Sequence, residues 1–428
     1  MKSLEMSWRR LVGLAALFGA LVACPAVDAA ILIPMDDEQT DHLRAYGLVL
    51  WVLQEGGEVD WLLGYRGGSF LICQTQDLDE WAEDQAAVMI DLDEESVSTI
   101  SKEITDSETM AIVSLTHSAR VAFYMPPTTP ISNPLVPLLE YSGITYSAVW
   151  DEDVLSRRLG DFDILMVPHE DFTGQFGRFH ASFRDADWYR TNVEAHEAEA
   201  RRLGFEKVGE LKRAVVRSIR DWVARGGILF GMCSGTDTFD IALATKGLDI
   251  WAAEFDGDGR TPEFNEKLDY TSTLAFKDFT LVQNPYIYEF SDIDMTPVAY
   301  KRGEKSDYFT LHEFSAKEQP LLAMLVQCHR NVVKGFMGQT TSFNKALLKD
   351  NIVILAEPEA GPDARYIYGT FGNGHFIWLG GHDPEDWQHR VGDPPTDPEL
   401  HKNSPAYRLI LNCILAPSAF LSLLDGAK

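Results

Sequence analysis

The chain has 428 residues, of which 65 are acidic and 37 basic, and its formal net charge is −28. Such a charge repels phosphate groups, which argues against nucleic acids and anionic membrane surfaces as partners, and solubility alone is the simplest reason for the acidity. A hydrophobic content of 45% is enough for a sizeable core, in one large domain or two ordinary ones.

Residues 1–29 have the pattern of a secretory signal peptide. A basic start precedes an uncharged apolar segment, LVGLAALFGALVA, that is too short to span a bilayer comfortably. Cleavage before Ala30 would release a soluble protein. The alternative cleavage site is the LVAC stretch at 21–24, which resembles a bacterial lipobox and would leave a lipid anchor on Cys24. Both cleavage sites predict an exported protein, either periplasmic or secreted, whereas an uncleaved segment would be a plain membrane anchor.

Residues 30–75 predict an N-terminal α/β segment with a βαβ-like order. Strand patterns at Ile31–Met35 and Glu58–Tyr65 are separated by helical periodicity over Asp37–Gly57. The glycine pair that follows, Gly67-Gly68, is typical of a tight turn or of a backbone that approaches a ligand closely.

The rest of the chain predicts a connecting region and a larger α/β domain. Residues 76–118 are acidic and weakly periodic, so we expect a moderately exposed connection with some helix. Residues 119–418 alternate strand and helix patterns, including a long charged helical region over Asp187–Arg225. Strands that alternate with helices predict a doubly wound parallel sheet.

A candidate nucleophile follows the apolar strand pattern at Ile228–Met232. The G-x-C-x-G motif places Cys233 on a sharp strand-to-helix turn, where the crowded backbone needs small neighbours. The helix N-terminus would favour the reactive thiolate, and the N–H of Ser234 would be an oxyanion donor. We expect a central parallel strand beside Phe162–Pro168. The alternative is an inert cysteine that fills a buried turn.

A cysteine nucleophile needs a base, and the base needs a group that orients it. His382 follows an apolar strand, the second of a predicted hairpin turned by Gly372–Gly374. Glu385 would hold the imidazole in the right tautomer, and Asp383 is the alternative. The same residues also fit a polar loop with an ordinary histidine.

The stretch GGILFGMCSGT and a late strand that ends in GHDPE resemble the class I glutamine amidotransferase-like superfamily. The resemblance covers roughly residues 119–418 and implies a flavodoxin-like sheet with a Cys-His-Glu triad. The elbow of the family is matched by Gly231, Cys233 and Gly235. The family has a His-Pro-Glu motif after this strand, and the corresponding stretch here, 382–385, has one additional residue. The oxyanion glycine of the family corresponds most nearly to Gly174.

A second resemblance, to exported bacterial proteins labelled asparagine synthetase B-like, rests on three short stretches, ILIPMDDEQTDHLRAYG, YRGGSF and GFMGQTTSFNKALL. A synthetase of that type needs an N-terminal catalytic cysteine and an S-G-G-x-D-S loop for ATP. The chain has neither, and Ser234–Thr238 matches the loop only in part. The resemblance therefore implies no synthetase activity.

Our hypothesis is a glutamine-amidotransferase-like hydrolase that cleaves a small-molecule or peptide-like amide through a thioester. Cys233 would attack, His382 would move the proton and Glu385 would orient His382. The N–H of Ser234 and Gly174 would stabilise the oxyanion, and no metal or organic cofactor would be required.

A binding protein is the alternative, because a fold does not fix a function. A non-catalytic module that keeps the superfamily fold could bind a ligand or a carbohydrate. Trp378 and Trp387 lie near the expected cleft and would suit stacking on sugars as well as packing in the core.

Overall fold

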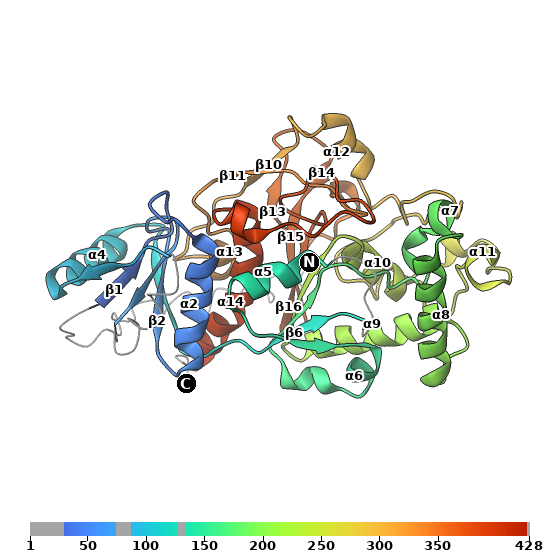
Figure 1. Cartoon of the computed structure of the whole chain (residues 1–428), viewed down its shortest axis with the longest axis horizontal. Helices are drawn as coiled ribbons and strands as arrows, with labels where there is room; N and C mark the ends of the chain where they lie inside the picture. The colour runs from blue at the N-terminus through green and yellow to red at the C-terminus, as the bar shows by residue number, and fades with distance from the viewer. Residues whose placement is uncertain (1–29, 74–86, 127–132, 426–428) are drawn as a thin grey trace, which may run out of the picture.

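The computed structural model describes residues 30–73, 87–126 and 133–425, which form two large β-sheets and a small two-stranded one with helices around them (Figure 1). The predicted signal peptide and the lipid anchor at Cys24 lie outside the described residues. Within the described ranges, no helix is long and apolar enough to cross a bilayer.

The N-terminal sheet is antiparallel, with the strand order β4-β1-β3-β2-β5. The predicted βαβ-like order is confirmed in part. β1 and β2 both run antiparallel to β3 and are therefore parallel to each other, with α2 (His42–Gln54) between them in the chain, but β3 is inserted between them in the sheet. A tight turn with positive φ at Gly67 and Gly68 returns the chain as a β2–β3 hairpin. The strands are β1 (Ala30–Ile33), β2 (Val59–Leu63), β3 (Ser69–Ile72), β4 (Ile90–Leu92) and β5 (Ala111–Leu115).

The segment expected to connect two α/β units instead contributes to this sheet. Within 76–118, β4 and β5 form the two edges, and α4 (Glu94–Asp106) packs against the sheet. The buried residues of α4 are Ile100 and Ile104, and most of its other side chains face solvent. This narrow apolar stripe explains why the sequence pattern is acidic and weakly periodic.

The second sheet has nine strands in the order β11-β10-β13-β15-β16-β9-β8-β6-β7. The five strands from β16 to β7 are parallel, and the other four continue the sheet in antiparallel fashion. The α/β class and the central parallel position of β9 are confirmed, as is its pairing with β8. The strands are β6 (Val121–Tyr124), β7 (Ser147–Val149), β8 (Ile164–Val167), β9 (Ile228–Met232), β10 (Tyr308–Leu311), β11 (Val332–Lys334), β13 (Val353–Glu357), β15 (Tyr366–Phe371) and β16 (Gly374–Leu379).

Helices cover both faces of the parallel strands. On one face, α9 (Val208–Ala224) and α10 (Ser234–Ala244) share a core with Leu229 of β9. The other face carries Phe230 and packs in a core that contains α2 (His42–Gln54), α5 (Leu135–Tyr141) and α14 (Pro405–Asp425). This second core also includes strands of the N-terminal sheet, and Figure 1 shows α2 and α14 side by side between the two sheets.

The long charged helical region is two helices. A left-handed glycine, Gly204, follows the end of α8 and stops it before α9 begins. The remaining helices and the small sheet are α6 (Asp151–Leu155), α7 (His180–Phe183), α8 (Asp187–Arg202), α11 (Ala253–Asp256), α12 (Thr296–Arg302), α13 (Pro320–Leu325), β12 (Phe343–Asn344) and β14 (Asp363–Ala364).

Candidate functional site

Cys233 lies at the turn between β9 and α10, with a φ of 51° and a ψ of −140°. Non-glycine residues rarely adopt this conformation, which is typical of a nucleophile elbow. A Cβ on Gly231 would lie 2.5 Å from the ring of Trp378 in β16, and one on Gly235 would lie 3.0 Å from the carbonyl oxygen of Val167 in β8. Close packing against the two neighbouring strands therefore explains both glycines of the motif.

Two imidazoles lie beside the sulfur. Nδ1 of His169 is 3.3 Å from Sγ of Cys233, and one ligand atom from each of His169, Cys233 and His382 lies within 4.8 Å of the other two. The two imidazole rings pack edge to face with their centroids 5.0 Å apart. The strands on either side of β9 each supply one histidine, since His169 follows β8 and His382 follows β16.

His382 was predicted from the sequence, whereas His169 was not. A usable indication was present, because His169 comes two residues after a strand that we expected to lie beside β9. The carboxyl ends of adjacent parallel strands meet at one edge of the sheet.

The segment Phe336–Thr341 covers the sulfur. The N–H of Gln339 donates to Sγ of Cys233 with an N–S distance of 3.2 Å. A Cβ on Gly338 would lie 3.1 Å from this sulfur and 2.7 Å from the backbone nitrogen of His382. The covering segment belongs to the stretch GFMGQTTSFNKALL, to which the sequence analysis assigned no role in the site.

We expect Gly338→Ala to lower the rate of Cys233 alkylation and of turnover by about 100-fold, because the new methyl group must displace the sulfur or the His382 backbone. Alkylation kinetics and melting temperatures measure the effect. Gly160→Ala is the matched control, since its Cβ would meet no atom within 4 Å. Equal rates in the two variants would contradict the close packing of the cover.

The surroundings make the thiol acidic and keep the imidazoles neutral. Burial alone raises the pKa of Cys233, but His382 and the N–H groups of Gln339 and Ser234 outweigh burial and bring this pKa below its ordinary value. Burial lowers the pKa of His169 and of His382, so each imidazole is free to accept a proton.

Neither predicted partner orients His382 in this structure. Glu385 faces His401, with an O–N distance of 3.3 Å, and Asp383 accepts hydrogen bonds from the hydroxyls of Thr396 and Tyr407. Among the described residues, Nδ1 of His382 is buried and has no hydrogen-bond partner. The turn that begins at Asp383, with its carbonyl accepting from the N–H of residue 386, directs Glu385 away from the imidazole.

Gly174, the predicted oxyanion glycine, packs elsewhere. A Cβ on this residue would lie 2.5 Å from the backbone nitrogen of Gly209, at the start of α9. The carboxylate of Asp171 holds the loop in this position by accepting the N–H groups of Gln175 and Gly177. The backbone donors that do face the sulfur belong to Gln339 and Ser234.

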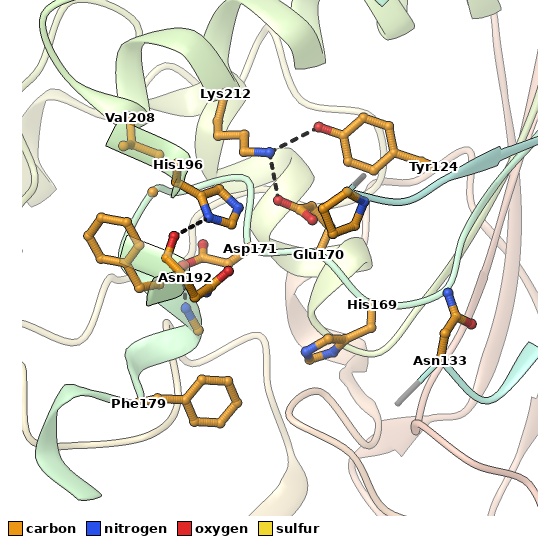
Figure 2. A pocket seen from close by; sticks show the side chains of 14 residues that line it. Tyr124, Asn133, His169, Glu170, Asp171, Phe179, Asn192, His196, Val208 and Lys212 are labelled. Atoms are coloured by element: carbon orange, nitrogen blue, oxygen red, sulfur yellow. Dashed lines mark hydrogen bonds and ion pairs between the residues drawn. The ribbon is translucent and has the colours of Figure 1, made fainter. Parts of the chain in front are cut away.

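A cavity of about 70 Å³ lies beside His169 (Figure 2). The buried Lys212 lines it, and its Nζ lies 2.8 Å from a carboxylate oxygen of Glu170. His169 lines this cavity and also contacts Sγ of Cys233, so one side chain lies between the cavity and the nucleophile. The other side chains that line the cavity include Tyr124, Asn133, Phe176, Phe179, Asn192 and His196.

A buried acid lies one helical turn after the nucleophile. Asp237 shares a hydrogen bond of 2.7 Å with the hydroxyl of Thr340, and its Oδ2 has no partner among the described residues. Burial raises the pKa of Asp237 to about 8, so its carboxyl is largely protonated at neutral pH.

Asp237→Asn should flatten the pH dependence of stability between about pH 4 and pH 8. The pKa of Asp237 is higher in the folded than in the unfolded chain, so the free energy of unfolding falls as the pH rises through this range. Asparagine keeps the shape of the side chain but does not ionise. Melting temperatures measured across the range test the change, and an equally steep slope in the variant would contradict a protonated Asp237.

No protein-family model matches the sequence, and no curated protein matches it significantly. Among solved structures, a cytoplasmic protein from Salmonella typhimurium is similar over 69% of this chain and 97% of its own, with 11% identity and a TM-score of 0.34. A protein from Thermoplasma acidophilum, provisionally assigned as part of a GMP synthase, is similar over 72% of this chain and 99% of its own, with 8% identity and a TM-score of 0.34. We therefore base the functional assignment on the geometry of the site.

Proposed function

We propose that this chain is a cysteine-dependent hydrolase that cleaves an amide or peptide-like bond through a thioester. One observation carries the proposal: the sulfur of Cys233, on a strained elbow, lies 3.3 Å from an imidazole nitrogen and accepts an N–H bond at 3.2 Å. An inert cysteine in a tight turn needs neither neighbouring histidines nor a converging N–H group.

The proposed reaction needs only groups at this site. Sγ attacks the carbonyl carbon of the amide while an imidazole, which we assign to His382, accepts the thiol proton. The oxyanion forms within reach of the N–H groups of Gln339 and Ser234. The C–N bond breaks as the imidazolium protonates the leaving amine, and the acyl group stays on sulfur. Water, deprotonated by the imidazole, then releases the acid and the thiol.

The sheet supports the class I glutamine amidotransferase-like assignment. Numbered along the chain, its parallel strands β7-β6-β8-β9-β16 have the order 2-1-3-4-5 that is typical of flavodoxin-like folds. Cys233 lies at the carboxyl end of β9, where open α/β sheets bind ligands. The leader pattern at residues 1–29 supports export of the mature chain.

The test is labelling with a mechanism-based glutamine analogue that alkylates cysteine nucleophiles. Metal-free protein should acquire one adduct, which peptide mapping places on Cys233, while Cys328 and Cys413 stay unmodified. Burial raises the pKa of Cys413 to about 12, which keeps this thiol unreactive. A panel of amides, peptides and esters then identifies the acyl group.

The binding-module alternative is the other outcome of this experiment. Trp378 gives it no support, because its ring is buried in the core against Phe239 and Phe376 and offers no face for a sugar. Tight binding of a carbohydrate, with no adduct on Cys233 and no turnover of any amide, peptide or ester, would replace the hydrolase proposal.

A further inference from the structure

We propose that His169, Cys233 and His382 also bind Zn²⁺, and that the bound ion blocks the nucleophile. The site is assigned from the ligand geometry alone. The block rests on the proposed function, because it presumes that Cys233 is the group that attacks the substrate.

The three side chains match the ligands and spacing that Zn²⁺ requires. Thiolate sulfur and imidazole nitrogen are its preferred ligands, and in tetrahedral coordination the ligand atoms lie about 3.5 Å apart. Nδ1 of His169 is 3.3 Å from Sγ of Cys233, and a nitrogen of His382 lies within 4.8 Å of both atoms. Small side-chain movements would close this triangle around an ion and leave the fourth position for water.

A second observation points to a ligand at this place. Nδ1 of His382 is buried but has no hydrogen-bond partner among the described residues, although buried polar atoms are usually satisfied. Neither Glu385 nor Asp383 reaches it. Coordination of the ion by this nitrogen would satisfy it.

One of the three ligands also borders a cavity. His169 is half-buried and is the one of the three that lines the cavity of Figure 2.

Two other clusters within the described ranges differ from this one. The carboxylates of Asp249, Asp256 and Asp258 are already paired with Nζ of Lys207. The group of Asp386, His389 and Asp393 lacks sulfur and is more exposed. The ligand set at Cys233 is therefore the one that favours Zn²⁺ over hard cations.

An ion at this site would stop the hydrolysis. The sulfur lone pair that attacks the carbonyl carbon would be engaged by the metal, and coordinated imidazoles could not accept the thiol proton. At a free Zn²⁺ concentration about ten times the Kd, about one tenth of the sites stay empty, and the labelling rate of Cys233 should fall about tenfold.

The experiment uses Co²⁺ as a spectroscopic substitute on the full mature chain. We expect one equivalent to give thiolate-to-cobalt charge-transfer and tetrahedral d–d absorption. Both bands should disappear in Cys233→Ser and weaken in His169→Ala. Cys328→Ser, at a free thiol that is partly buried, is the control and should keep both bands. Zn²⁺ should displace Co²⁺ and slow iodoacetamide labelling of Cys233, and a chelator should restore the rate.

The two proposals fail in different ways. No thiolate-to-cobalt band, a band that survives Cys233→Ser, or full labelling in saturating Zn²⁺ overturns the present inference. Labelling of metal-free protein by the glutamine analogue tests the hydrolase separately. A cobalt band without an analogue adduct supports the metal site and overturns the hydrolase.

Discussion

Cys233→Ala should abolish both hydrolysis and labelling by the glutamine analogue. The variant has no sulfur to attack the carbonyl carbon or to carry the acyl group. His382→Ala should lower turnover by about 10²- to 10⁴-fold, the usual contribution of a general base. The double variant should be no worse than Cys233→Ala alone, because residues that act as one unit are not additive.

Comparing His169→Ala with His382→Ala decides which imidazole moves the proton. We expect His382→Ala to remove the limb of the pH–rate profile that reports the general base. His169→Ala should keep this limb but weaken substrate binding, because His169 lines the cavity. If His169→Ala alone removes the limb, the base is His169, whose Nδ1 is the nitrogen found 3.3 Å from the sulfur.

The carboxylates after His382 supply the control variants. Glu385→Gln should be nearly silent, since Glu385 contacts His401 and not His382. Asp383→Asn should mainly lower the melting temperature, because the Asp383 carboxylate accepts hydrogen bonds from Thr396 and Tyr407. A loss of about 10²-fold or more in Glu385→Gln with unchanged melting temperature would mean that the loop closes to form the triad after substrate binds. Melting curves accompany every assay.

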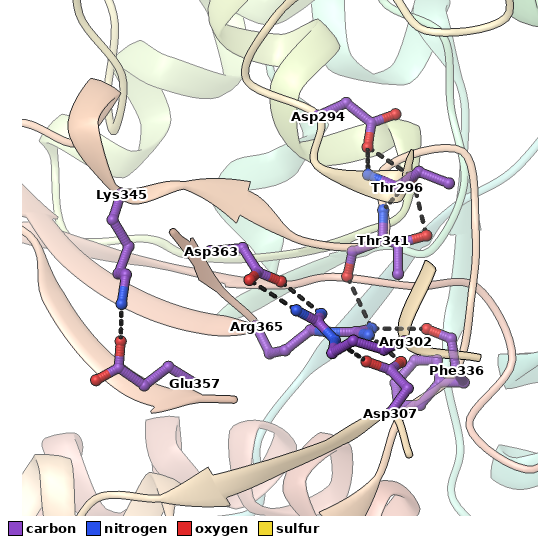
Figure 3. A network of polar contacts seen from close by, with 10 residues as sticks. All are labelled: Asp294, Thr296, Arg302, Asp307, Phe336, Thr341, Lys345, Glu357, Asp363 and Arg365. Carbon is purple, nitrogen blue, oxygen red and sulfur yellow. Dashed lines mark hydrogen bonds and ion pairs between the residues drawn. The ribbon is translucent and has the colours of Figure 1, made fainter. Parts of the chain in front are cut away.

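Arg365→Met should destabilise the fold by about 3–5 kcal/mol, the usual cost of removing one partner from a buried ion pair. Figure 3 shows the guanidinium of Arg365 between Asp307 and the segment that covers the nucleophile. The side chain of Arg365 is fully buried, pairs with the carboxylate of Asp307 and donates to the carbonyl oxygens of Phe336 and Thr341 at 2.8 and 3.0 Å.

Arg365 is therefore a positioning residue for the cover over Cys233. It holds both ends of the segment that brings the N–H of Gln339 to the sulfur, so its loss should also slow labelling of Cys233 in protein that is still folded. Arg365→Lys should restore only part of the stability and of the labelling rate that Arg365→Met loses, because an ammonium group cannot reproduce the planar fork of guanidinium donors.

Lys345→Met is the matched control for Arg365→Met. The Lys345–Glu357 pair lies in the same region of Figure 3, with an N–O distance of 2.7 Å, but its side chains are 31% and 27% exposed. Water screens such a pair, so Lys345→Met should lower the free energy of unfolding by at most about 1 kcal/mol. Denaturant unfolding measures both variants. Equal losses would show that the buried network has no special part in holding the cover.

The local elements of the site could be predicted from the sequence because their causes are local. An apolar strand, two small residues and a helical run around Cys233 leave the backbone one compact way to turn. The hairpin turned at Gly372 likewise depends on neighbouring residues, and it places His382 at the end of a strand that pairs with β9.

Contacts between residues that are far apart in the chain could not be predicted from the sequence. His169 and Gln339 lie 64 and 106 residues from Cys233 along the chain, and no local periodicity relates them to the sulfur. Spacing predicts Glu385 as the partner of His382, but spacing does not show which way the turn at Asp383 directs this side chain, which contacts His401 in the structure.

By itself, the sequence determined an α/β chain with a strained cysteine between a strand and a helix, since side-chain size and apolar periodicity act over a few residues. Only the tertiary structure decided that β3 enters between β1 and β2, because strand partners are chosen by the packing of whole sheets. The same packing decided that two histidines and the segment around Gly338 meet at Cys233.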